Sequence, residues 1–105
     1  MREFTIVKTT GENNLTYSVK GRLDSITSSE LQDTLITAFN ENTRVTLDFE
    51  ELTYISSAGL RVLLMAQKTA SGRKGSFTII NVSNEIKEIF DMTGFTKILS
   101  INPAE

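Results

Sequence analysis

The sequence predicts an α/β domain in which a mixed β-sheet is built in the order β-β-α-β-α-β-α-β, with the helices packed mainly on one face. Two patterns predict this fold. Apolar and polar residues alternate over 15–20 and 45–49, as in strands that bury one face. Between such segments, apolar residues recur three and four positions apart, as in amphipathic helices. At 105 residues, with 39% hydrophobic and 23% charged residues, we expect residues 1–105 to form a single domain.

The first two strands are expected to form a hairpin. The segment Phe4-Thr5-Ile6 precedes the strand at 15–20, and the intervening Gly11-Glu12-Asn13-Asn14 has the composition of a turn. Two further apolar segments, at 77–80 and 98–101, are predicted as strands.

Three helices are predicted between the strands. The first follows a candidate capping box at 27–30 and has an apolar stripe formed by Leu31, Leu35, Ala38 and Phe39. The second is expected to end at Ser71-Gly72, where glycine can adopt the left-handed conformation, and its stripe is formed by Ala58, Val62, Met65 and Ala66. Ser83 is a candidate cap for the third, which should end at Gly94 and bury Ile86, Ile89 and Phe90.

Composition excludes several classes of function. The chain has no histidine and no cysteine, which Ser-His-Asp triads, Cys-His pairs and the common zinc sites require, so we expect no enzyme, cofactor or metal site. The net charge of -2 and the scattered basic residues argue against nucleic-acid binding. We find no apolar run long enough to span a membrane and no signal peptide at the start of the chain, so a cytoplasmic protein without membrane insertion is expected.

The run from Tyr54 to Arg61 contains the strongest candidate for a functional site. It places Ser56 and Ser57 between an apolar segment and the second helix. A serine there lies at a helix N-terminus, where free N–H groups and the helix dipole can accommodate a phosphate. Ser57 is therefore a candidate phosphorylation site. Capping of the helix by Ser57 or Ser56 is the simpler alternative on spacing alone.

The loop after the first long strand should lie beside these serines. If 15–20 and 45–49 are parallel strands of one sheet, their C-terminal ends share an edge, which is where α/β sheets place their sites. We therefore expect Asp24 and Ser57 to face one surface patch, although a turn or cap carboxylate is the common interpretation of such an aspartate. Gly59 is unfavourable in the first turn of a helix, so its presence needs a reason. Either the helix packs closely on a strand at this position or a partner approaches closely, and packing is the simpler explanation.

Three segments in register resemble the STAS domain family. They are Gly21-Arg22-Leu23-Asp24, Tyr54-Ile55-Ser56-Ser57-Ala58-Gly59-Leu60 and Phe90-Asp91-Met92-Thr93-Gly94-Phe95, and the resemblance covers nearly the whole chain. STAS domains occur as bacterial anti-sigma factor antagonists and in the cytosolic tails of sulfate transporters.

The resemblance implies a protein-binding switch. An antagonist of this family binds an anti-sigma factor that is also a serine kinase, which frees the sigma factor; phosphorylation breaks the complex, and a serine phosphatase restores it. The acceptor position matches Ser57. The loop aspartate of the family matches Asp24, and the expected partner-binding residues are Asp24, Ser25, Ser56, Ser57, Ala58, Gly59 and Arg61.

Ser56 departs from the family pattern, because well-studied antagonists usually have an aspartate immediately before the acceptor. Ser56 is therefore an alternative acceptor. The departure also motivates an alternative function, in which the chain is a scaffold subunit of a bacterial transport or signalling complex without a phospho-switch. In either case we expect a monomer or weak dimer.

Overall fold

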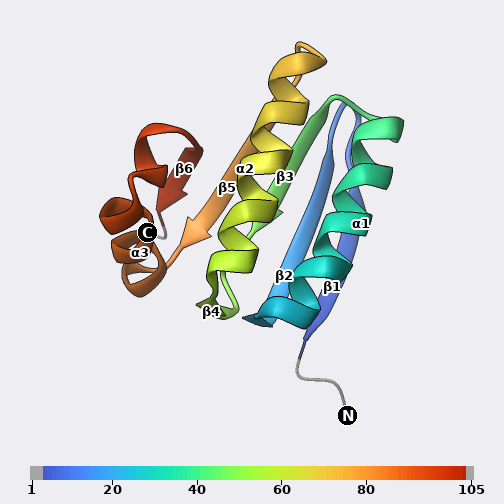
Figure 1. Ribbon diagram of the computed structural model, residues 1–105. Helices are drawn as coiled ribbons and strands as arrows, with labels where there is room; N and C mark the ends of the chain where they lie inside the picture. The colour runs from blue at the N-terminus through green and yellow to red at the C-terminus, as the bar shows by residue number, and fades with distance from the viewer. Residues whose placement is uncertain (1–3, 104–105) are drawn as a thin grey trace.

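The computed structural model describes residues 4–103, which form a mixed sheet and helices (Figure 1). In chain order, the elements are β1 (Thr5–Thr10), β2 (Leu15–Leu23), α1 (Ser25–Glu41), β3 (Arg44–Asp48), β4 (Leu52–Ile55), α2 (Ser57–Gly72), β5 (Ser76–Val82), α3 (Asn84–Thr93), the 3₁₀ helix η1 (Phe95–Lys97) and β6 (Ser100–Pro103). The predicted order of strands and helices is confirmed, with β4 and η1 as additions.

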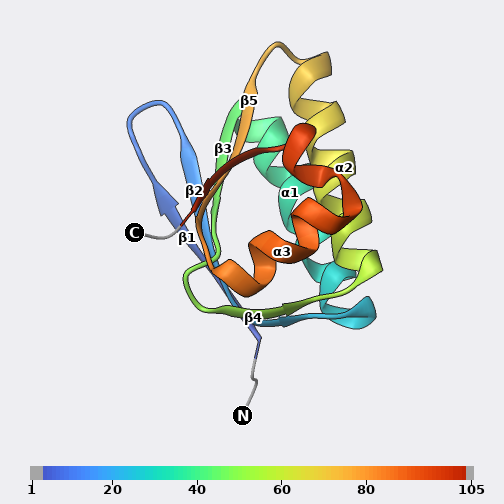
Figure 2. The same cartoon turned by 90° about the vertical axis from the view of Figure 1, so that its left-hand side faces the viewer.

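The sheet has the strand order β1-β2-β3-β5-β6, and β4 pairs with β2 outside this path. Strands β1 and β2 form the predicted antiparallel hairpin, closed by a hydrogen bond from Gly11 N–H to the Asn14 carbonyl. The other pairings are parallel, because a helix crosses over between the strands. Figure 2 shows the helices on one side of the sheet, as predicted.

Alternate residues of the central strands face the helices and form the core. On β2 and β3 the buried positions are Leu15, Tyr17, Val19, Leu23, Val45 and Leu47. The helices contribute most of the residues expected from their apolar spacing, including Leu31, Leu35, Val62, Ala66, Ile86 and Phe90. Ala58, Met65 and Ile89, which were also expected on the buried faces, are only half-buried. Within residues 4–103, no helix is long and apolar enough to cross a membrane.

The start of α1 differs from the prediction. The expected capping box at 27–30 is wrong by one turn, because Asp24 is the N-cap and Thr27 occupies the third helical position. The Asp24 carboxylate accepts hydrogen bonds from Ile26 and Thr27 N–H, and the Thr27 hydroxyl accepts one from Asp24 N–H. An aspartate satisfies the free N–H groups as well as a serine or threonine does, so both boxes were compatible with the sequence.

The C-terminal ends of α2 and α3 are closed in different ways. Helix α2 ends at Gly72 as predicted, but the left-handed residue is Lys74, with φ +56°, and not Gly72. Arg73 reaches from this end to α1, where its guanidinium donates to the Phe39 carbonyl at 2.7 Å. At the end of α3, Gly94 has φ +81°, and Ser83 caps the start, both as predicted.

The C-terminal region contains one further difference. The strand expected at 98–101 begins at Ser100, because η1 and a turn occupy the preceding residues. Of the aromatic residues near it, Phe90 is buried, as predicted, and Phe95 is half-buried. Met92, by contrast, is 86% exposed and does not join the core.

Candidate functional site

The starts of α1 and α2 lie side by side at one edge of the sheet. Strand β4 pairs in parallel with the end of β2, with Leu23 opposite Ile55, and the Ser56 N–H donates to the Leu23 carbonyl at 2.9 Å. The next residues on the two strands are Asp24 and Ser56, and these are the N-caps of α1 and α2. The predicted neighbourhood of the Asp24 loop and the Ser57 segment is thus present in the structure.

Gly21 allows β2 to pair with β3 along its first half and with β4 at its end. Residues 15–18 of β2 pair with β3, whereas 21–23 pair with β4, and the register shifts between Gly21 and Arg22. Gly21 has φ +104°, a conformation that is strained for residues with a side chain. Its N–H donates to the Glu51 carbonyl, and its own carbonyl accepts from the Thr53 hydroxyl. This bulge turns the end of β2 towards β4 and thereby brings the two helix starts together.

Asp24 has a structural role that leaves part of its carboxylate available. Its Oδ1 atom accepts the capping hydrogen bonds, and among the described residues Oδ2 has no hydrogen bond. The pKa of Asp24 is held below its usual range, mainly by hydrogen bonds from the backbone N–H and the hydroxyl of Thr27. The hydrogen bond from Ile26 N–H and the positive charge of Arg22 lower it further. Asp24 therefore remains charged at neutral pH.

Replacing Asp24 by alanine is expected to lower stability at neutral pH. Because the folded-state pKa is depressed, the contribution of the carboxylate is fully present above the ordinary aspartate pKa of about 3.9 and is lost as the pH falls through the lower folded-state value. The difference in thermal midpoint between wild type and Asp24→Ala should be constant from neutral pH down to about pH 5 and shrink in more acidic buffer. Asp33→Ala, on the exposed side of α1, is the control; an equal loss there would contradict the assignment.

The two serines at the start of α2 have different surroundings. Ser56 is the N-cap, half-buried, and its hydroxyl accepts a hydrogen bond from Gly59 N–H at 3.3 Å. Ser57 is the first helical residue; its side chain is exposed, and among the described residues its hydroxyl makes no hydrogen bond. Ser25 is the corresponding exposed first residue of α1. The Ser56 hydroxyl is thus used by the helix cap, whereas the Ser57 hydroxyl has no partner in the part of the chain that the structure describes.

Gly59 is required by packing behind this surface. A Cβ atom at this position would lie 2.8 Å from Ile55 Cγ1 and 3.0 Å from Leu23 Cδ2. Both neighbours are buried, at the ends of β4 and β2. The first turn of α2 therefore sits directly against the paired strand ends, which is the packing explanation expected for Gly59. Ala58, also among the expected partner-binding residues, is half-buried beside it.

Arg22 and Tyr54 form a contact at this edge that was not recognised in the sequence. They are opposite each other on β2 and β4, and the Arg22 guanidinium lies 4.1 Å from the centre of the Tyr54 ring. Both side chains are exposed, and stacking of this kind is a favourable cation–π geometry. Only the pairing of β4 with β2 brings them together, so spacing along the chain gave no signal.

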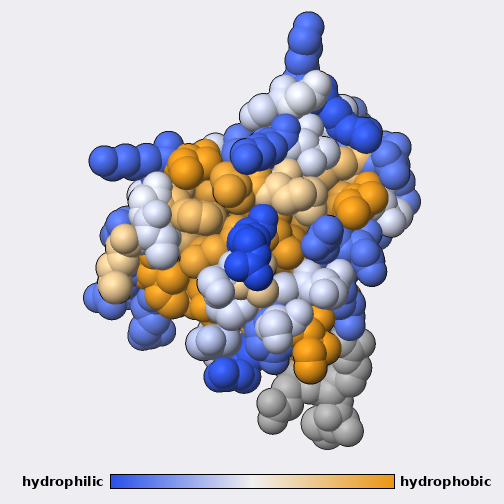
Figure 3. All heavy atoms as spheres, in the orientation of Figure 1, coloured by the Kyte–Doolittle hydropathy of each residue, from blue (hydrophilic) through white to orange (hydrophobic). Residues whose placement is uncertain are grey.

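A shallow groove runs along α2 away from Ser57. Its volume is about 520 Å³, and it is lined by Arg61, Leu64, Met65, Lys68 and Thr69. Figure 3 shows apolar surface over α2 and towards α3, interrupted by hydrophilic side chains. Arg61 belongs both to this groove and to the first turns of α2, one turn beyond Ser57.

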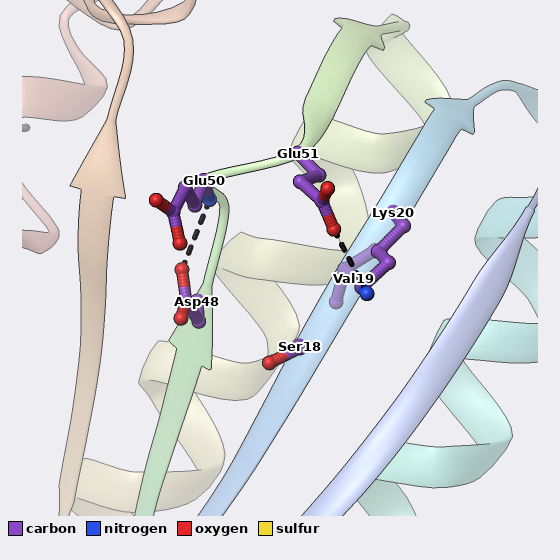
Figure 4. Close-up of a pocket in the computed structure, with 6 residues that line it drawn as sticks. All are labelled: Ser18, Val19, Lys20, Asp48, Glu50 and Glu51. Carbon is purple, nitrogen blue, oxygen red and sulfur yellow. Dashed lines mark hydrogen bonds and ion pairs between the residues drawn. The ribbon is translucent and has the colours of Figure 1, made fainter.

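A second hollow, of about 120 Å³, lies between the ends of β2 and β3 (Figure 4). Within residues 4–103, three of its four charged side chains have hydrogen-bond or ion-pair partners, namely Lys20, Asp48 and Glu51. Lys20 forms an ion pair with Glu51 at 2.9 Å, and the Asp48 carboxylate accepts from Glu50 N–H and the Asn81 side chain. Within residues 4–103, no group of carboxylates is arranged to hold a metal ion. Asp48 and Glu51 therefore have structural partners at this edge.

Comparison with known proteins identifies similar sequences. The family model described as Mlab, STAS domain matches residues 7–100. The chain is 31% identical over 84 residues to BtrV of Bordetella bronchiseptica, a protein assigned as an anti-sigma factor antagonist, covering 79% of this chain and 72% of the relative. It is 24% identical over 91 residues to the anti-sigma-B factor antagonist of Bacillus subtilis, covering 87% and 84%.

Solved structures share the fold. An anti-sigma factor antagonist from Mycobacterium paratuberculosis superposes with a TM-score of 0.86 at 18% identity, covering 95% of this chain and 86% of that one. The antagonist SpoIIAA in its unphosphorylated form gives a TM-score of 0.78 at 18% identity, with 93% and 86% covered. SpoIIAA of Bacillus has also been solved in its phosphorylated form, with a TM-score of 0.72, 18% identity and coverage of 93% and 89%.

Proposed function

The chain belongs to the STAS domain family, and on this basis we propose that it is an anti-sigma factor antagonist switched by phosphorylation of Ser57. In the unmodified state it binds an anti-sigma factor that is also a serine kinase, and the sigma factor is released. The observation that carries the proposal is the exposed Ser57 hydroxyl at the start of α2, which lies beside the Asp24 loop and makes no hydrogen bond within residues 4–103.

The modification transfers the γ-phosphoryl group of ATP to Ser57 Oγ. The hydroxyl proton leaves, ADP is released, and a phosphate ester forms on the first turn of α2. A serine phosphatase reverses the step by hydrolysis, which yields the free hydroxyl and inorganic phosphate. The catalytic groups for both steps belong to the partner enzymes, and this chain supplies only the acceptor.

The capping arrangement favours Ser57 over Ser56 as the acceptor. Ser56 is half-buried, and its hydroxyl is held by Gly59 N–H, so modification there would remove the cap of α2. Ser57 is exposed and its hydroxyl has no competing partner among the described residues. A kinase can therefore reach Ser57 without unfolding the start of the helix.

A phosphate on Ser57 is tolerated by the fold and repelled by a docked partner. The ester carries about -1.5 to -2 charges at neutral pH and adds them to a surface that already contains Asp24. The start of α2 has no acidic residue in its first turn, and the helix dipole favours the new charge. In an interface, like-charge contact and desolvation of the phosphate cost several kcal/mol, enough to release the partner.

Phosphorylation by the cognate kinase tests the proposal. The protein is incubated with ATP and the anti-sigma factor kinases of its host, and the phosphate is mapped by mass spectrometry. We expect one phosphate on Ser57 in wild type and in Ser56→Ala, and none in Ser57→Ala. Modification confined to other serines or threonines, or no modification by any of these kinases, would be incompatible with the switch.

The alternative function is a scaffold subunit without a phospho-switch, similar to the STAS subunit of bacterial lipid-transport ABC systems. The identity of residue 56 favours it, because Ser56 provides a neutral cap where antagonists usually have an aspartate, and a scaffold requires no acceptor. Affinity purification of the tagged protein from its native host separates the two functions. A transporter ATPase in the purified complex supports the scaffold, whereas a sigma-regulating kinase excludes it.

A further inference from the structure

We propose that Arg61 binds the phosphate on Ser57 within the same molecule, so that phosphorylation withdraws Arg61 from the groove along α2 as well as adding negative charge. This inference rests on the proposed phosphorylation of Ser57. It assigns to Arg61 a role in regulation, as the residue that holds and partly neutralises the phosphate.

The helical spacing places the two side chains on one face. Ser57 and Arg61 are four residues apart in α2, and side chains at this spacing have Cβ atoms about 5–6 Å apart. Both residues are exposed. A guanidinium can span the remaining distance and donate two parallel hydrogen bonds to phosphate oxygens, a geometry that lysine cannot reproduce.

Arg61 is the cation at this edge that remains available. Among residues 4–103 it makes no hydrogen bond, ion pair or ring contact. The other nearby arginine, Arg22, is stacked on the Tyr54 ring and contributes to the electrostatics of Asp24. The next cation along α2 is Lys68, eleven residues from Ser57 and thus about 16 Å along the helix axis.

Withdrawal of Arg61 would change the groove on α2. In the unmodified protein Arg61 lines one end of this groove, beside the half-buried Leu64 and Met65. When the guanidinium turns back towards a phosphate on Ser57, the groove loses a positive charge and a hydrogen-bond donor at the end nearest the modification. A partner that contacts Arg61 would then lose an attractive contact and meet a repulsive charge at the same time.

The second pKa of the phosphate tests this contact without a partner. Phosphoserine is installed at position 57 of the full chain by genetic encoding, and the phosphate is titrated by ³¹P NMR. A neighbouring cation stabilises the dianion, so Arg61 should lower the second pKa from its ordinary value of about 6. Arg61→Gln should raise it by roughly 0.4 pH unit relative to wild type. The negative charge of Asp24 raises the second pKa, but it does so equally in wild type and in Arg61→Gln, so the difference between them reports on Arg61.

Two further variants separate a specific contact from general electrostatics. Lys68→Gln removes the same charge from the same helix and should leave the second pKa unchanged, because the lysine lies too far away. Arg61→Lys keeps the charge but loses the two parallel hydrogen bonds, so its second pKa should lie between those of wild type and Arg61→Gln. Equal second pKa values in wild type and Arg61→Gln, or equal shifts in Lys68→Gln and Arg61→Gln, would overturn the proposal.

The outcome does not depend on the proposed switch. If no host kinase modifies Ser57, the proposed function fails, whereas the titration of the installed phosphoserine still reports whether Arg61 binds it. The opposite combination is also informative. If a kinase modifies Ser57 but the phosphoserine has the same second pKa in wild type and Arg61→Gln, the switch remains and Arg61 has no part in it.

Discussion

Replacing Ser57 by aspartate is expected to weaken binding to the anti-sigma factor by more than a hundredfold, while thermal stability stays near that of wild type. The reason is the position of Ser57, exposed on the first turn of α2 and beside the Asp24 loop. A carboxylate there faces the partner, and a penalty of about 3 kcal/mol in the interface corresponds to more than a hundredfold in Kd. The fold itself tolerates a negative charge at a helix start.

The measurement is titration calorimetry with the anti-sigma factor of the same organism, with thermal unfolding of each variant alongside. Ser57→Ala should bind like wild type, because it removes only the acceptor hydroxyl. Ser76→Asp is the matched control, since it adds the same charge at the exposed start of β5, at the opposite end of the parallel strands. Wild-type affinity in Ser57→Asp would mean that charge at this position does not regulate binding.

Truncation of Leu63 to alanine is expected to cost about 2–5 kcal/mol of unfolding free energy through the cavity it leaves. Leu63 has no exposed surface and points from the middle of α2 into the core. Helix α2 packs against α1 and the sheet, so the core that receives Leu63 is held by several elements and can collapse into the space only in part.

Leu64→Ala provides the control for this loss. It removes the same atoms from the adjacent position of α2, but Leu64 is half-buried and lines the open groove, so its loss should be clearly smaller. Urea unfolding at constant m-value compares the two variants. Equal losses in Leu63→Ala and Leu64→Ala would show that α2 does not bury the face assigned to it.

The helices could be predicted because their signals are local. The spacing of Leu31, Leu35 and Phe39 fixes the buried face of α1, and the structure buries all three. Ser83 and Gly94 bound α3 as predicted, because a capping hydroxyl and a left-handed glycine each act within one turn. Where two caps were available, as at Asp24 and 27–30, the local signal did not distinguish them.

Strand β4 could not be predicted in the same way. Residues 52–55 have the burial pattern of a short strand with buried ends and exposed middle residues, without strict alternation. The strand exists because β2 bulges at Gly21 and offers its end as a pairing partner. The contact between Arg22 and Tyr54 depends on this pairing, as does the position of Ser56 beside Leu23. None of these is a property of a contiguous segment.

The sequence by itself determined the fold class, the order of the strands and helices other than β4 and η1, most of the faces that they bury, and the two segments that meet at one edge of the sheet. These follow from periodicity and from residues whose preferences act over a few positions. Only the tertiary structure decided which serine caps α2 and which is free, because a shift of one residue in the helix start exchanges their roles. That start is fixed by the pairing of Leu23 with Ile55 and by the packing of Gly59 against both, contacts between residues distant in the chain.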